Sequence, residues 1–300
     1  IKTAQAQTSD ALARILRKGS ISFSGAKDIR DSLLRLKVGS SLSIAELLRV
    51  SALLRVALRA SDYGKRDHEP GEEDDALDAM FRELAPVVSL AKEIDRCILS
   101  EEEIADDASN GLRSVRRAMK TAAEKIRTQL NSLVVNSRTY LQDGVITMRN
   151  GRYCVPVKAE HKSNVPGMVH DQSSSGSTIF VEPLSVVKLN NELRELEIRE
   201  QKEIEAVLAA LSNQTCDHLD ELTLDLELIG ELDFIFAKAA LSRHYRGCEP
   251  RLNKDGIIRL KNARHPLLDP HRVVPITLTL GENFDLLIVT GPNTGGKTVS

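Results

Sequence analysis

The sequence predicts a mainly α-helical protein with a small antiparallel β element inserted in it and the first strands of an α/β domain towards its C-terminal end. The composition favours helices, because the 300 residues include no Trp and only 3% aromatic residues, while 41% are hydrophobic. Between Gly144 and Val181 the hydrophobic period changes from that of a helix to two, which indicates strands. Short β-branched runs return after about Cys248, and the last of them leads into a glycine-rich loop.

The first hundred residues are predicted to be helices separated by short breaks. Helices are expected at 10–18 and 26–38, each followed by a glycine that can end a helix in the left-handed conformation. Ser43 and Glu46 have the spacing of a capping box and predict a third helix that runs to about Ala60.

A polar loop and a further helical region complete this part of the chain. The stretch 62–75 contains two glycines and a proline and predicts a surface loop. The helical period resumes at Ala76, and Pro86 predicts a boundary because proline interrupts a helix interior.

Residues 110–138 predict an amphipathic helix with a marked positive charge. Its apolar stripe consists of Leu112, Val115, Met119, Ile126, Leu130 and Leu133. The remainder contains seven cations and one acid, a net charge of +6, whereas the whole chain has a net charge of −2. Such cations can hold the phosphates of a nucleic acid without reading its sequence. The candidates are Arg113, Arg116, Arg117 and Lys120. A solvated helix face is the equally open alternative.

The inserted β element is predicted from three short runs, at 145–148, 153–157 and 178–181. The Asn150-Gly151 pair between the first two runs is typical of a two-residue hairpin turn. Arg149 and Arg152 flank this turn and are further candidates for nucleic-acid contact.

Residues 184–245 predict long helices of partial coiled-coil character, since they contain one glycine and no proline. The heptad is imperfect, because Glu200 and Glu203 fall where the seam of a coiled coil expects apolar residues. Beyond these helices, strands are expected at 257–260, 276–280 and 286–289.

A phosphate-binding loop follows the last predicted strand and matches the pattern GxxxxGK[ST] at every fixed position. It consists of Gly291, Pro292, Asn293, Thr294, Gly295, Gly296, Lys297 and Thr298. Glycines allow successive backbone N–H groups to curl around a phosphate. Lys297 can place its ammonium group between the β- and γ-phosphates, and the Thr298 hydroxyl can join the shell of Mg²⁺. The expected cofactor is therefore ATP with Mg²⁺; a glycine-rich turn without a ligand is the alternative.

Hydrolysis also needs a second acid to hold Mg²⁺ and a group that orients water. We expect both to lie beyond Ser300, so no catalytic residue is assigned and the chain itself is not expected to turn over ATP. Because the first residue is Ile1 and the sequence opens within a helical pattern, we expect a fragment of a longer protein.

Other classes of protein find little support. Four scattered cysteines without a CxxC pair favour a reduced, cytoplasmic protein. No apolar run approaches the roughly 20 residues that cross a bilayer, so no membrane partner is expected. His161, His170 and the serine run 173–177 lack the GxSxG pattern of a nucleophile elbow.

The motifs together resemble the second bacterial branch of the MutS proteins, MutS-two, which have ABC-type ATPase domains. The resemblance rests on the loop that starts at Gly291, on Ala263–Leu268, on Asn150–Lys158 and Val169–Pro183, and on Leu232–Lys238. It is strongest from about Asp143 onward.

This resemblance implies a domain organisation and a set of partners. It implies a helical core at 1–108, a clamp with a β tip at 109–212, a returning core helix at 213–247 and the start of an ABC-type P-loop ATPase domain at 248–300. The parent is then expected to be a homodimeric ATPase and endonuclease with a C-terminal Smr nuclease domain. It would split collided ribosomes, through ribosomal RNA, or suppress homologous recombination on DNA. Two alternatives stay open: a repair ATPase for mismatched or branched DNA, and a helical scaffold with a vestigial P-loop.

Overall fold

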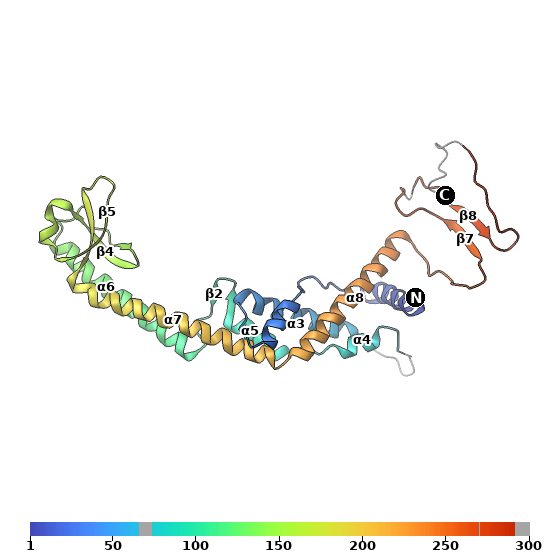
Figure 1. Ribbon diagram of the computed structural model, residues 1–300, viewed down its shortest axis with the longest axis horizontal. Coiled ribbons are helices and arrows are strands. Elements are labelled where there is room, and N and C mark those ends of the chain that lie inside the picture. The colour runs from blue at the N-terminus through green and yellow to red at the C-terminus, as the bar shows by residue number, and fades with distance from the viewer. Residues whose placement is uncertain (66–73, 270, 292–300) are drawn as a thin grey trace. The chain divides into compact units, whose positions relative to one another are not determined.

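A computed structural model describes residues 1–65, 74–269 and 271–291 of the chain (Figure 1). Within these residues the protein is mainly α-helical with small antiparallel sheets, which confirms the predicted fold class. The chain contacts divide it into two units. The larger comprises 23–65 and 82–229, and the smaller comprises the described residues of 1–22, 66–81 and 230–300. None of the described helices is long and apolar enough to cross a membrane.

The larger unit begins with a helical core. Its elements are α2 (Arg30–Lys37), α3 (Ile44–Gly64), α5 (Val88–Cys97) and the two-stranded antiparallel sheet of β1 (Ile98–Ser100) and β2 (Glu103–Ile104). The apolar side chains that α3 turns inward, with Ile94 of α5, are almost completely buried. This burial holds the short helices, which would be marginal alone in water.

Local hydrogen bonds set where these helices begin. Glu46 N–H donates to the Ser43 hydroxyl at 3.4 Å and Ser43 N–H donates to the Glu46 carboxylate at 2.9 Å, which confirms the predicted capping box. The second helix begins at Arg30 rather than at the predicted residue 26. The Asp28 carboxylate accepts the Arg30 N–H at 3.0 Å, and this local bond competes with helix formation.

Two long helices lead from this core to a small sheet and back (Figure 1). They are α6 (Asn110–Asn136), α7 (Leu184–Cys216), and between them β3 (Thr147–Arg149), β4 (Arg152–Lys158), a 3₁₀ turn (Ala159–Asn164), β5 (Gly167–Gln172) and β6 (Thr178–Pro183). The strands form one antiparallel sheet in the order β3-β4-β6-β5. Asn150 and Gly151 both have positive φ, 50° and 73°, which confirms the predicted hairpin turn.

Strand β5 is not among the predicted runs. It lies at the edge of the sheet, and none of its residues is fully buried. Its sequence, Gly-Met-Val-His-Asp-Gln, therefore shows no apolar alternation that could have indicated a strand.

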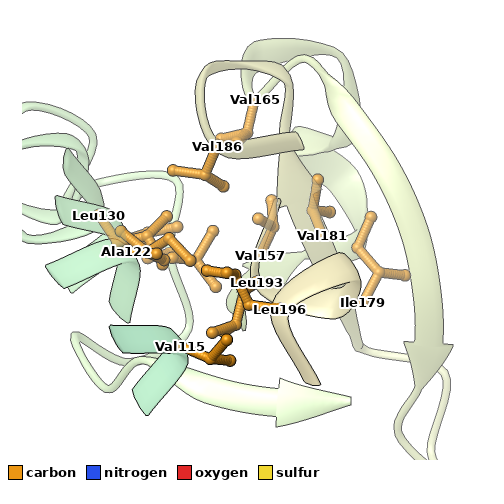
Figure 2. Packing of buried hydrophobic residues seen from close by; sticks show 13 residues of the cluster. Val115, Ala122, Leu130, Val157, Val165, Ile179, Val181, Val186, Leu193 and Leu196 are labelled. Carbon is orange, nitrogen blue, oxygen red and sulfur yellow. The ribbon is translucent and has the colours of Figure 1, made fainter. Parts of the chain in front are cut away.

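A single apolar cluster joins the sheet to both long helices (Figure 2). Val115, Ile126 and Leu130 come from α6, whereas Leu193 and Leu196 come from α7. The sheet contributes its buried valines and Ile179. Since α6 leads towards the sheet and α7 returns from it, the two helices pack as an antiparallel pair.

The smaller unit contains α1 (Lys2–Lys18) and the strands β7 (Ile258–Ala263) and β8 (Ile276–Leu280), which pair antiparallel. Both strands were predicted, whereas α1 begins well before the predicted residue 10. Helices α4 (Asp78–Glu83) and α8 (Leu219–Tyr245) each have residues in both units. In the smaller unit the buried Arg14 donates to Asp75 at 2.6 Å and to Asp78 at 2.7 Å.

The strand predicted at 286–289 does not form, and this prediction is wrong for the described chain. Leu286 and Ile288 are each 73% exposed. A strand exists only through hydrogen bonds to a neighbour, and no strand within the described residues pairs with this run.

We predict that Ser43→Ala lowers the free energy of unfolding by about 1 kcal/mol, because it removes the side-chain oxygen of the capping box. Urea unfolding followed by circular dichroism measures this change. Ser41→Ala, at an exposed serine two residues earlier, is the matched control. Equal stability of the two variants would contradict a stabilising role for the capping box.

Candidate nucleic-acid interface and phosphate-binding loop

One face of α6 carries a row of cations that are open to solvent. At about 100° per residue, Arg113, Arg117, Lys120 and Arg127 lie within about 80° of one another around the helix. All four are exposed, and Glu124 is the acid that falls among them. The buried side chains of α6 point to the opposite side, towards α7. We call these four residues the cationic stripe.

The structure gives Arg113 a weak partner and records none for the side chains of Arg117 and Lys120 among the described residues. The Arg113 guanidinium lies 3.5 Å from the Asp107 carboxylate, with both side chains more than half exposed. An exposed pair of this kind contributes little stability. These three candidates therefore remain available to a phosphate backbone.

Arg116 differs from its neighbours because its side chain is held inside the protein. Its guanidinium donates to Glu200 of α7 at 2.7 Å and to the Ile104 carbonyl at 2.7 Å. It also pairs with Asp106 at 2.5 Å. Three of the five N–H donors of this guanidinium are thus used inside the protein, and two neighbouring carboxylates balance its charge, which leaves it less suited to a phosphate than the exposed cations.

The two candidate arginines of the β hairpin also have internal partners. Arg149 lies over the Phe180 ring at 4.1 Å and 3.1 Å from the Asp171 carboxylate. Arg152 donates to Glu182 at 2.7 Å and to Asn191 at 2.7 Å. Their spacing beside a turn marked them as surface cations, whereas the fold uses them to fasten the sheet.

We call the sheet β3-β4-β6-β5 the tip. Glu182 is completely buried and lies at the centre of a polar network in this tip. Besides Arg152 of β4, it accepts a hydrogen bond from Asn190 of α7 at 2.8 Å, and His170 Nε2 of β5 lies 2.6 Å from its second oxygen. Burial raises the pKa of the Glu182 carboxyl, but the bonds from Arg152, Asn190 and His170 outweigh burial, so the pKa lies below its usual range. A single carboxylate thus ties β4, β5, β6 and α7 together.

Two parts of this arrangement were missed from sequence. Arg127 was counted as part of the basic segment but not as a candidate contact. Its spacing from Arg113, Arg117 and Lys120 would have placed it on the same helix face. The Glu182 network gave no signal, because its partners lie 8 to 30 residues away along the chain.

Only the first residue of the predicted phosphate-binding loop lies within the described residues. Gly291 has a φ of 136°, a backbone conformation that residues other than glycine rarely adopt. A Cβ added at this position would meet no atom within 4 Å. This suits a loop whose backbone approaches a phosphate closely. The remaining predicted residues lie outside the described residues: Pro292, Asn293, Thr294, Gly295, Gly296, Lys297 and Thr298.

Comparison with known proteins finds relatives that carry the same name. The chain is 55% identical over 296 residues to the Endonuclease MutS2 of Lachnospira eligens, covering 98% of the chain and 37% of that protein. It is 53% identical over 302 residues to the Endonuclease MutS2 of Agathobacter rectalis, covering 100% of the chain and 38% of that protein. The chain thus spans less than two fifths of the length of these relatives. No model of a protein family matches it.

We predict that Glu182→Gln lowers the stability of the tip by about 3 kcal/mol, because it leaves Arg152 without its buried counter-charge. This value is at the low end of what the loss of one partner of a buried ion pair costs, because the Arg152 side chain is 28% exposed. Hydrogen exchange of the β4 and β6 amides measures the change, with Glu160→Gln as the exposed control.

The same pair of proteins gives a pH test. Because the pKa of Glu182 is lowered in the folded state, the ionised carboxylate contributes fully to the stability of the tip at pH values above the ordinary glutamate pKa of about 4.3. This contribution is lost as the pH falls through the lowered pKa. The difference between wild type and Glu182→Gln should therefore shrink below that range. A difference that grows with acid would contradict the lowered pKa.

Proposed function

Since the chain belongs to the MutS2 family, we propose that it forms two parts of a larger homodimeric protein. One is a nucleic-acid-binding arm, made of α6, α7 and the sheet between them, and the other is the start of the ATP-binding domain. The observation that carries this proposal is the cationic stripe, an exposed row of four cations on a helix whose other side is buried in the cluster with α7. Endonuclease is part of the relatives' printed name, and we extend DNA or RNA cleavage only to the full-length protein.

The stripe suits a phosphate backbone better than a folded protein partner. Its cations follow one helix face over the distance from Arg113 to Arg127, which is about 21 Å at 1.5 Å per residue. Four cations against the single acid Glu124 give this face a net positive charge, which matches the repeated phosphates of DNA or of ribosomal RNA. Contacts of this kind hold a backbone in place without sequence preference.

ATP with Mg²⁺ is the proposed cofactor. Lys297 would supply the cation between the β- and γ-phosphates, and Thr298 would provide a hydroxyl for the metal. In the homodimer, nucleotide binding would then change how two arms are held. We place this protein in the cytoplasm, where ribosomes and DNA are both accessible.

The identity of the nucleic acid separates the remaining alternatives. A protein that splits collided ribosomes should be competed from ribosomes only weakly by branched DNA, whereas a recombination or repair ATPase should prefer branched DNA. A structural scaffold with a vestigial loop would bind no ATP. Direct competition between purified ribosomes and a four-way junction, with and without ATP, distinguishes the three.

We predict that replacing Arg113, Arg117 and Lys120 together with Gln weakens DNA or RNA binding and flattens its salt dependence. Each lost phosphate contact reduces the slope of log K against log salt by about 0.9 on duplex DNA, so the triple variant should lose up to about 2.7. Gln is a good helix former, so α6 should persist, and circular dichroism can check this.

The matched control replaces Lys27, Lys37 and Arg49, three exposed cations of the helical core, with Gln. It removes the same charge from the same unit of the protein. If both triple variants lose the same slope, general charge and not the stripe accounts for binding. If neither differs from wild type, the stripe is a solvated helix face.

In the full-length protein, Lys297→Ala should weaken ATP binding at least tenfold, because it removes the cation at the β/γ-phosphates. Equilibrium binding of a fluorescent ATP analogue with Mg²⁺ measures this affinity. Lys261→Ala, at an exposed lysine of β7, serves as the control. Unchanged ATP affinity in Lys297→Ala would remove the nucleotide-binding assignment.

A further inference from the structure

The contact between α6 and α7 changes from apolar to polar near the N-terminal end of α6. Along α7, alternating steps of three and four residues connect Leu193, Leu196, Glu200, Glu203 and Val207. This is the spacing of a coiled-coil seam, in which every one of these positions expects an apolar residue. The two glutamates therefore occupy consecutive seam positions, and both have partners on or next to α6.

Glu200 is held by Arg116 of α6. The Arg116 Nε donates to Glu200 Oε1 at 2.7 Å, and both side chains are only 24% exposed. The same guanidinium reaches the Ile104 carbonyl and Asp106, which lie just before α6 begins. One side chain therefore connects α6, α7 and the segment that enters α6.

Glu203 packs against the first turn of α6. Its carboxylate lies 3.5 Å from the hydroxyl of Ser109, the N-cap residue of α6. A Cβ on Gly111 would overlap the Glu203 carboxylate, so any larger residue in place of Gly111 would displace that side chain from its present position. A carboxylate at this position also faces the positive end of the helix dipole.

Apolar seams alone allow slippage, because one Leu or Val can replace another after a shift along the helix. A polar pair in the seam fixes the register, because a shifted pair would leave charges unpaired in a half-buried position. We propose that Arg116, Glu200 and Glu203 form a register lock that positions the cationic stripe and the β tip along α7. Arg116 is then a positioning residue, whereas Arg117 contacts phosphates; this second part rests on the proposed function.

The lock is tested by the distance between spin labels on Gln129→Cys of α6 and Glu192→Cys of α7, two exposed sites. Cys216 and Cys248 are replaced by Ser. Cys97 and Cys154 can stay, because burial raises the pKa of both thiols to about 11 and leaves them unreactive. All proteins carry Asp106→Asn, so that a carboxylate at position 116 meets no second acid.

We expect one narrow distance in this background. Arg116→Glu should add a population displaced by about 5 Å, one helical turn, and the swap of Arg116→Glu with Glu200→Arg should restore the single distance. An unchanged distance in a folded Arg116→Glu protein would overturn the lock, as would a swap that fails to restore it. If Arg116→Glu does not fold, Glu200→Gln removes the same ion pair and is judged in the same way.

Salt titrations separate this inference from the proposed function. Arg117→Gln should reduce the salt slope of nucleic-acid binding by about 0.9, whereas Arg116→Gln should leave that slope unchanged. A reduced slope in Arg116→Gln with an unchanged distance would make Arg116 a phosphate contact and overturn the lock. If wild type binds no nucleic acid, the proposed function fails, while the label distances still decide the lock.

Discussion

The antiparallel packing of α6 on α7 is the constraint on which the rest of the arm depends. Burial of Ile126 and Leu130 against α7 decides which face of α6 is hidden, and so which cations reach solvent. The same apolar cluster extends into the sheet, so the tip has no separate core of its own. A sheet of four short strands gains much of its stability from such packing on helices.

Arginines of similar local sequence take different roles because their partners lie far away along the chain. Arg116 and Arg117 are adjacent, yet a rotation of about 100° directs one towards Glu200 and the other into solvent. Arg152 neutralises Glu182, a buried carboxylate that would otherwise be costly. A high density of cations in sequence is therefore a poor guide to which of them remain free for a ligand.

Local signals predicted most helices because helix ends are set by nearby residues. The capping box at Ser43 and the break at Pro86 both occur where expected. Strands were harder, because a strand is defined by a partner that the local sequence does not contain. Thus β5 forms without an apolar alternation, whereas the apolar run at 286–289 forms no strand within the described residues.

By itself the sequence determined the fold class, the basic amphipathic helix and the hairpin turn, and it contains the GxxxxGK[ST] pattern that begins at Gly291. Each of these depends on residues within a few positions of one another. The tertiary structure decided which cations are free, why glutamates interrupt the seam at Glu200 and Glu203, and that Glu182 is buried with three partners. These features depend on contacts between segments distant in sequence, and burial fixes their energies only after the chain has folded.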